Sequence, residues 1–338
     1  MRRVTTLGII GAGRIGRLHA ENIITNPNIK LKSISDIFLD SMKDWAEELG
    51  IEQIVADYKD IIEDEEIDAV FVCSPTSTHA GIIKEAASKG KHIFCEKPIS
   101  FSTEETKEVL EAVESAGVKF QVGFNRRFDR NFSRIHSIVK EGGIGSPQMI
   151  KITSRDPAPP PAEYILKSGG LFFDMAIHDF DMARYLACSE VVEVFATGAN
   201  LVEPYIKEAG DIDTAIITLK FENGALGVID NSRKAVYGYD QRVEVFGSEG
   251  NLTCDNDRNS SVELSTENGS LKDPLKHFFL ERYEEAYHKE TIAFIDSIQN
   301  DLPLVCSGFD GLQAEIIAKA SKTSYEQGRP VKIGTIDL

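Results

Sequence analysis

The sequence contains few cysteines and lacks long apolar runs, and both shortages exclude classes of protein. No apolar run approaches the roughly 20 residues that a membrane-spanning helix needs, and the stretch 4–10 is too short for a signal peptide. The five cysteines among 338 residues include no C-x-x-C pair. We therefore expect no disulfide framework and no bound metal, and we expect the reduced thiols of a cytoplasmic protein.

Positive charge is also scarce. The chain carries 37 Lys and Arg residues against 54 Asp and Glu residues, which gives a formal net charge of -17. An acidic surface repels nucleic-acid phosphates and anionic lipids, so we expect neither nucleic acid nor a membrane as a partner. A neutral small molecule meets no such repulsion. The composition, with 42% apolar and 27% charged residues, is that of a globular protein, and 338 residues suit two domains.

The first 125 residues alternate between short apolar segments and amphipathic ones. The apolar segments are rich in β-branched residues, as strands buried on both faces are. The pattern predicts strands at 4–10, 31–36, 67–73, 91–95 and 119–122, and helices at 14–25, 41–49, 78–89 and 103–116. Strands that alternate with helices form a parallel sheet with helices on both faces. Residues 1–125 are therefore predicted to form a doubly wound Rossmann domain of the α/β class.

The pattern changes after residue 125, where strand-like segments follow one another. Strands are predicted at 148–154, 191–199, 214–221, 225–232, 241–246 and 250–254, and helices at 171–187, 281–300 and 308–327. Asn223-Gly224 is a typical hairpin turn. Residues 126–338 are predicted to form an α+β domain with a large, mostly antiparallel sheet. Its C-terminal helices are candidates for packing back on the first domain, and its open sheet face is expected to be buried against another subunit.

A glycine-rich loop follows the first predicted strand. Its sequence, Gly11-Ala12-Gly13-Arg14-Ile15-Gly16, has the G-x-G-x-x-G pattern of dinucleotide-binding domains. The glycines allow a tight turn, close approach of a diphosphate and close packing of helix on strand. Asp36 ends the next strand, where a carboxylate accepts hydrogen bonds from ribose hydroxyls and repels the extra phosphate of NADP. We expect NAD as the cofactor; the alternative is a glycine-rich turn that binds nothing.

A lysine suited to catalysis follows the fourth predicted strand. Lys97 lies in Glu96-Lys97-Pro98, at the carboxyl end of a strand, where ligands of open α/β sheets bind. Because a residue before proline favours an extended backbone, Pro98 restricts the conformation of Lys97. The alternative interpretation is a surface Glu–Lys pair.

The predicted helix 171–187 carries a narrow polar stripe. Four residues fall within an arc of about 60° on the helical wheel, and apolar side chains flank them: Asp174, His178, Asp181 and Tyr185. A solvated helix face would be broader and richer in charge. Asp174 is one turn from His178, so its carboxylate can orient an imidazole that acts as a general base. The alternative is a buried polar pair that only stabilises the helix.

These motifs and four further segments resemble those of the glucose–fructose oxidoreductase/inositol dehydrogenase family. The further segments are Gly123-Phe124-Asn125-Arg126-Arg127-Phe128-Asp129, Thr153-Ser154-Arg155-Asp156-Pro157, Asp174-Met175-Ala176-Ile177-His178-Asp179-Phe180-Asp181 and Tyr237-Gly238-Tyr239-Asp240-Gln241. The resemblance covers essentially the whole chain. It implies a Rossmann domain followed by a domain with a large sheet, through which subunits assemble as a homotetramer.

The resemblance also implies roles for individual residues. Lys97, Asp174 and His178 would form the catalytic triad and would also contact the substrate. The expected NAD-binding residues are Gly11, Gly13, Arg14, Ile15, Gly16, Asp36, Ser74, Thr76, His79, Glu96 and Lys97. The pocket for a polyol substrate would add Arg127, Asp181, Tyr237 and, as a weaker candidate, Arg155. The alternative for Arg126 and Arg127 is a surface charge pair at the domain junction.

The activity that the resemblance implies is NAD-dependent oxidation of a cyclitol hydroxyl to a ketone. The expected substrate is myo-inositol and the expected product 2-keto-myo-inositol. Whether Lys97 or His178 is the immediate base stays open, because the two can titrate as a unit. The alternatives are a dehydrogenase of another inositol isomer or an aldose, and a non-catalytic NAD-binding sensor. A biliverdin-reductase-like enzyme would share the first domain but would not explain the pairing of Asp174 with His178.

Overall fold

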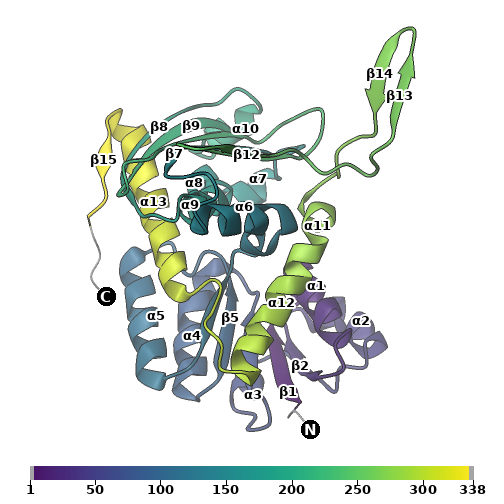
Figure 1. Ribbon diagram of the computed structural model, residues 1–338. Coiled ribbons are helices and arrows are strands. Elements are labelled where there is room, and N and C mark those ends of the chain that lie inside the picture. The colour runs from purple at the N-terminus through teal and green to yellow at the C-terminus, as the bar shows by residue number, and fades with distance from the viewer. Residues whose placement is uncertain (1–3, 335–338) are drawn as a thin grey trace. The chain divides into compact units, whose positions relative to one another are not determined.

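The computed structural model describes residues 4–334, which form two compact units (Figure 1). The first unit contains the chain up to Asn125 together with Glu285–Glu315, and the second contains Arg126–Glu284 together with the chain from Ile316. The segment Glu285–Glu315 thus belongs to the first unit although it follows most of the second in sequence. No helix within residues 4–334 is both long and apolar enough to cross a membrane.

A six-stranded parallel sheet forms the centre of the first unit, as predicted. Its strands are β1 (Thr5–Ile10), β2 (Ile29–Ser35), β3 (Gln53–Val55), β4 (Ala69–Val72), β5 (His92–Glu96) and β6 (Phe120–Gly123). Their order is β3-β2-β1-β4-β5-β6, and all neighbouring pairs are parallel. The strand order reverses between β1 and β4. Open α/β sheets bind their ligands at such a point, outside the carboxyl ends of the strands.

Helices cover this sheet, and the strands are apolar because they are buried between layers. The helices are α1 (Arg14–Ile24), α2 (Lys43–Glu48), α3 (Lys59–Ile62), α4 (Thr76–Ser88), α5 (Thr103–Ala116) and α12 (Glu284–Gln299), with a 3-10 turn η1 (Leu39–Ser41). Leu7, Phe71 and Phe94 on three of the strands are fully buried. Helix α5 begins where the sequence predicts, because the Ser102 side chain accepts a hydrogen bond from the Glu105 N–H.

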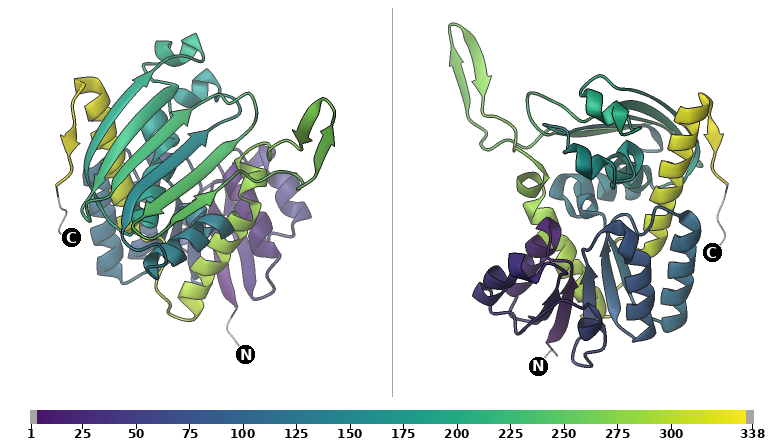
Figure 2. Two further views of the ribbon diagram at one scale, coloured as in Figure 1. Left: turned by 45° about the horizontal axis from the view of Figure 1, so that its top comes forward. Right: turned by 180° about the vertical axis from the view of Figure 1, so that it is seen from behind.

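A seven-stranded mixed sheet forms the second unit. Its strands are β7 (Pro147–Arg155), β8 (Val191–Ala199), β9 (Thr214–Phe221), β10 (Leu226–Ser232), β11 (Asp240–Gly247), β12 (Asn251–Cys254) and β15 (Val331–Lys332). They lie side by side in the order β12-β11-β7-β10-β9-β8-β15 (Figure 2). Only β7 and β10 run parallel, so the prediction of a mostly antiparallel sheet is confirmed. Gly224 has φ +87° in the predicted hairpin turn between β9 and β10.

Helices α6 (Arg130–Lys140) and α9 (Ala176–Ala187) pack against one face of this sheet (Figure 1). The other helices are η2 (Asn125–Phe128), which starts in the first unit, α7 (Ala162–Ile165), α8 (Leu171–Asp174), α10 (Pro204–Glu208), α11 (Phe279–Arg282) and α13 (Gly308–Gln327), which begins in the first unit and ends in the second. A separate hairpin of β13 (Glu263–Thr266) and β14 (Gly269–Lys272) extends away from the sheet (Figure 1). The other sheet face exposes apolar side chains, among them Met149, Leu226 and Phe246.

Two predicted helices are each divided in the structure. The predicted helix 171–187 breaks at Met175, where the His178 N–H bonds the Met175 carbonyl, three residues back instead of four. The predicted helix 281–300 is divided at Tyr283 into α11 and α12. Neither break coincides with a glycine or proline, the residues that normally indicate one in a sequence. The prediction of continuous helices was therefore wrong at these two points.

Candidate active site

The glycine-rich loop is tightly packed at two of its glycines and open at the third. Gly11 has φ +100°, and a Cβ there would lie 2.6 Å from the Ser74 nitrogen. A Cβ on Gly16 would lie 1.9 Å from the Gly11 carbonyl oxygen. A Cβ on Gly13, in contrast, would meet no described atom within 4 Å. Gly11 and Gly16 therefore serve the packing of the loop, whereas Gly13 leaves room for a ligand to approach the backbone.

The first turn of α1 and the end of β2 offer the groups that NAD needs. Gly13 is the N-cap of α1, no side chain caps the helix, and its first turn holds no acidic residue. Its first N–H groups are therefore available to a diphosphate. The Asp36 carboxylate accepts hydrogen bonds of 2.9 Å from the Ala12 and Phe38 N–H groups, which fix it beside the loop. Arg14 is exposed and Ile15 is half-buried in the same turn. These residues fit NAD.

Alanine at Gly13 and alanine at Gly16 are expected to have different effects. Gly13→Ala should keep the free energy of unfolding within about 0.5 kcal/mol, since the new methyl group meets no protein atom. The methyl group occupies the approach to the backbone, so the Kd for NAD should rise about tenfold or more. Gly16→Ala should destabilise the first unit by clashing with the Gly11 carbonyl. Thermal unfolding and NAD titration of both variants check this; equal losses of stability would contradict it.

The remaining NAD-binding candidates lie at the carboxyl ends of β4 and β5. The His79 ring is buried, with Nδ1 2.8 Å from the Pro98 carbonyl and Nε2 2.7 Å from the Ser74 carbonyl. Burial lowers the pKa of His79, and the two carbonyls oppose that shift. The ring thus connects the loop after β4 to Pro98, the residue that follows Lys97. Thr76 begins α4, and Lys97 is half-buried directly after β5.

Asp174 in the second unit is held from two sides. The Tyr164 hydroxyl donates a 2.8 Å hydrogen bond to Oδ1, and Arg233 donates one of 3.1 Å to Oδ2. Arg233 is 1% exposed. A carboxylate with two such donors is fixed in orientation. His178 lies four residues further along, beyond the break at Met175, and is half-buried near the start of α9.

Two further substrate candidates, Arg155 and Tyr237, lie where neighbouring strands of the sheet begin or end. Because β7 and β10 run parallel, they end together, and antiparallel β11 begins beside them, with Asp240 opposite Arg155. Arg155 donates hydrogen bonds to Asp230 at 2.6 Å and to the Tyr237 hydroxyl at 3.0 Å, and Tyr237 donates to Asp240 at 2.6 Å. The structure therefore brings Arg155 and Tyr237 together.

The two arginines at the start of the second unit are buried, so the alternative of a surface charge pair was wrong. Arg126 is 5% exposed and lies 2.5 Å from Asp179. Arg127 is 7% exposed and binds Asp181 through two nitrogens, at 2.6 to 3.1 Å. Both partners belong to α9, which the sequence separates from the arginines by more than 50 positions. The ion pairs fix η2 and α6 against α9.

Three residues of this region were not predicted to belong to the site. Tyr164 and Arg233 contact Asp174, and Asp156 lies close enough that the charges of Asp174 and Arg233 affect it. Asp156 follows Arg155 in a segment on which the family resemblance rests, so its position was a usable signal. Tyr164 and Arg233 lie in segments without a recognisable motif, and only the tertiary structure identifies them.

Burial raises the pKa of Asp156 to about 7, and the Asp174 charge adds to this while Arg233 opposes it. Since the folded-state pKa exceeds the unfolded one, the free energy of unfolding falls as pH rises from about 4 to about 7. Asp156→Asn removes this loss, which amounts to about 1–4 kcal/mol. Its Tm should exceed that of the wild type at pH 8, by about 2–4 °C for each kcal/mol, and by less at pH 5. An equal difference at both pH values would contradict this.

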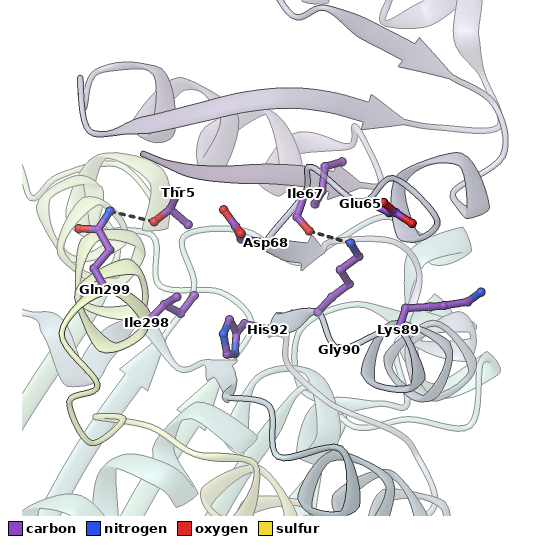
Figure 3. A pocket seen from close by; sticks show the side chains of 10 residues that line it. Thr5, Glu65, Ile67, Asp68, Lys89, Gly90, His92, Ile298 and Gln299 are labelled. Atoms are coloured by element: carbon purple, nitrogen blue, oxygen red, sulfur yellow. Dashed lines mark hydrogen bonds between the residues drawn. The ribbon is translucent and has the colours of Figure 1, made fainter. Parts of the chain in front are cut away.

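A further cleft of about 560 Å³ lies in the first unit (Figure 3). It is at the amino ends of the strands, where Thr5 begins β1 and His92 begins β5. Gln299 donates a 2.8 Å hydrogen bond to the Thr5 hydroxyl, and Lys91 donates one of 2.7 Å to the Ile67 carbonyl. The glycine-rich loop follows the carboxyl end of β1, so this cleft is not part of the NAD site.

The fold and the sites define an NAD-binding oxidoreductase with a second domain built on a large sheet. Residues 5–124 match the oxidoreductase family with an NAD-binding Rossmann fold, and residues 132–253 match the GFO/IDH/MocA C-terminal domain. The chain belongs to the GFO/IDH/MocA family of oxidoreductases, and its cofactor is NAD.

Three relatives illustrate the similarity. The chain is 56% identical to the uncharacterized oxidoreductase YrbE of Bacillus subtilis, with 98% of each chain covered. It is 49% identical to the myo-inositol 2-dehydrogenase of Thermotoga maritima, over 97% of this chain and 98% of the relative. A crystal structure of scyllo-inositol dehydrogenase from Lactobacillus casei with NAD(H) and scyllo-inositol matches with a TM-score of 0.91 and 33% identity. That match covers 98% of this chain and 99% of the other.

Proposed function

We propose that this protein oxidises a hydroxyl of a cyclitol to a ketone with NAD, and that the substrate is myo-inositol and the product 2-keto-myo-inositol. The names of the relatives support a cyclitol substrate. The observation that carries the proposal is the fixed Asp174 carboxylate, held by Tyr164 and Arg233 four residues before His178. A non-catalytic sensor has no need of a carboxylate held in this way.

Each catalytic role follows from the chemistry of the side chain. His178 takes the proton of the reacting hydroxyl, and Asp174 stabilises the imidazolium that forms. Lys97 donates a hydrogen bond to the developing alkoxide, a charge that exists mainly in the transition state. NAD, when bound, supplies the hydride acceptor. The alternative, in which Lys97 is the immediate base and His178 relays the proton, uses the same three side chains.

The polyol is held by groups that can both donate and accept hydrogen bonds. Arg155 and Tyr237 contact each other where the strands end and remain candidates, although Arg155 lies on the same face of β7 as Met149. Arg127 and Asp181 are retained as candidates, although their mutual ion pair already uses much of their hydrogen-bonding capacity. A site built to bind hydroxyls discriminates strongly, because each buried polar group left unpaired costs about 1–3 kcal/mol.

A substrate panel tests the proposal. NADH formation is measured with NAD or NADP and with myo-, scyllo- and chiro-inositol, glucose and xylose. We expect the highest kcat/KM with myo-inositol and NAD. A faster reaction with another isomer or with an aldose would retain the chemistry but replace the substrate. NADH binding without turnover on any polyol would favour the sensor.

We also propose that subunits assemble as a homotetramer through the exposed face of the seven-stranded sheet. Leu226, Met149 and Phe246 are in register across β10, β7 and β11, with 51%, 39% and 44% of their surface exposed. Such a continuous apolar row is typical of an interface. Leu226→Glu should lower the mass measured by light scattering, whereas Lys107→Glu on the exposed face of α5 should not; an unchanged mass for Leu226→Glu would contradict the proposed interface.

We further propose a cytoplasmic location. Cys73 and Cys95 carry thiols whose pKa burial raises, and buried reduced thiols are typical of that compartment.

A further inference from the structure

Three ionisable side chains meet inside the first unit, and the proposed reaction uses none of their charges. They are His19 on α1, Glu96 at the end of β5 and Glu290 on α12. Their nearest nitrogen and oxygen atoms all lie within 4.8 Å of one another. His19 and Glu290 are 0% exposed, and the Glu96 side chain is 14% exposed. Charges removed from water in this way need a partner or a proton.

The hydrogen bonds of His19 show where one proton resides. The Thr291 hydroxyl donates to the Tyr287 carbonyl at 3.1 Å, so its oxygen is left to accept from Nδ1 of His19, also at 3.1 Å. Nδ1 therefore carries a hydrogen. Nε2 lies 3.1 Å from Oε1 of Glu96, and this contact also requires a proton between the two atoms. Whichever atom carries it, the His19–Glu96 pair has no net charge.

The surroundings of Glu290 favour its protonated form. Neither of its carboxyl oxygens has a hydrogen-bond partner among residues 4–334. Burial raises its pKa well above the usual value, and the Glu96 charge adds to the shift. The Cys73 thiol also faces this group, since Glu96 and Glu290 both raise its pKa beyond the effect of burial. The Tyr287 ring also borders the cluster, since its centroid lies 6.0 Å from the centroid of the His19 ring.

Glu96 connects this cluster to the cofactor. The β1–β3 half of the sheet carries the glycine-rich loop and Asp36, so the β4–β6 half is left for the nicotinamide half of NAD. Glu96 ends β5 in that half, directly before Lys97. Its carboxyl group lies against Gly123 on β6, where an added Cβ would be only 3.0 Å from the carboxyl carbon. The carboxyl group therefore has little room to move toward β6.

We propose that His19, Glu96 and Glu290 form a buried proton-holding cluster in which protonated Glu290 is a positioning residue, and that its ionisation shifts the preference of the enzyme between oxidised and reduced NAD. The inference needs NAD as the ligand and goes beyond the proposed function, because it does not depend on which substrate is oxidised. The nicotinamide ring is cationic when oxidised and neutral when reduced. A negative charge on Glu290 therefore favours binding of the oxidised form, by about tenfold for charges several ångströms apart in a protein.

Cofactor binding measured against pH tests the inference. The Kd of NADH is obtained from its fluorescence, and that of NAD by competition, between about pH 6 and pH 10 for the wild type and E290Q. The glutamine amide has the shape of the protonated acid and cannot ionise. In the wild type the ratio of the NADH Kd to the NAD Kd should rise about tenfold with pH. In E290Q it should keep the value that the wild type has at low pH. A rise of the same size in E290Q would overturn the inference.

One control variant tests the neighbouring thiol, and a second measurement applies if E290Q does not fold. In the Cys73→Ser variant the ratio of the NADH Kd to the NAD Kd should rise with pH as it does in the wild type. A ratio that stayed constant in this variant would assign the titration to the Cys73 thiol and overturn the inference. If E290Q does not fold, calorimetry of the wild type in two buffers of different ionisation enthalpy takes its place. NAD binding should then release more protons than NADH binding does. Equal proton release by the two forms of the cofactor would contradict the inference. A stoichiometric metal ion in the wild type that E290Q lacks would also contradict a proton-holding role.

The two proposals fail separately. A pH-dependent cofactor preference without oxidation of any polyol would leave the cluster assigned and remove the proposed function. Oxidation of a polyol with a ratio that does not change with pH would remove the cluster assignment alone.

Discussion

His178→Ala is expected to lower kcat with myo-inositol by about 10²–10⁴-fold, because the substrate hydroxyl loses the group that takes its proton. His178 belongs to the second unit, whereas the glycine-rich loop and Asp36 belong to the first. The Kd for NAD should therefore stay within about twofold of the wild type. Steady-state rates give kcat, and titration of NAD in competition with NADH gives the Kd for NAD.

Controls distinguish loss of the base from loss of the fold. His288→Ala removes an exposed histidine from the surface of α12 and should leave kcat unchanged. Lys97→Ala should lower kcat by about 10²–10³-fold, as loss of a donor to a developing oxyanion does. A His178→Ala enzyme that turned over at the wild-type rate would refute the assigned role.

Arg127→Ala is expected to destabilise the second unit by about 3–5 kcal/mol, because it leaves the carboxylate of Asp181 buried without its main partner. Asp181 is 1% exposed, and Arg127 binds it through two nitrogens. Urea unfolding followed by circular dichroism measures the loss. Lys30→Ala is the matched control, because it breaks a pair with Glu52 in which both side chains are about half exposed. That variant should lose less than about 1 kcal/mol.

A double replacement separates the stabilising role of this pair from a role in substrate binding. Arg127→Met combined with Asp181→Leu removes both charges and should recover much of the lost stability. If the pair also binds the polyol, the double variant will fold but its KM for myo-inositol will rise at least about tenfold. An unchanged KM would restrict both residues to a structural role. A single Arg127→Ala variant as stable as the wild type would contradict the buried ion pair itself.

The sequence predicted those parts of the fold that local patterns determine. Strands β1, β4 and β5 are buried on both faces and appear as short apolar runs. The turn at Gly224 was predicted from residue chemistry and the helix 103–116 from its amphipathic pattern, and the structure has both. The short elements β3, β13, β14 and β15 were missed, because two to four partly polar residues give no periodic signal.

One missed helix did carry a signal. Helix α6 begins at Arg130, and the side chain of Asp129 accepts hydrogen bonds from the next N–H groups, as an N-cap does. The break in the predicted helix 171–187 has no such marker, since Met175 is an ordinary helix-forming residue. The sequence alone therefore could not place that break.

The residues of the site also fall into those that local sequence patterns indicate and those that only the tertiary structure brings together. The roles of Gly11, Gly13 and Gly16 depend on a local loop, and the spacing of the glycines indicated them. The partners of Asp174 come from segments 10 and 59 positions away, Tyr164 and Arg233. Without an alignment or a structure, no pattern connects such positions. The cluster around Glu290 was missed for the same reason, since its members lie on α1, β5 and α12.

The measurement that tests the central claim most directly is transfer of deuterium from myo-inositol labelled at the reacting ring carbon. The labelled substrate is incubated with the wild-type enzyme and NAD, and both products are analysed by mass spectrometry. The account predicts reduced cofactor that carries one deuterium and a ring ketone that carries none. Reduced cofactor without deuterium, or no reduced cofactor at all, would contradict direct hydride transfer from the cyclitol to NAD.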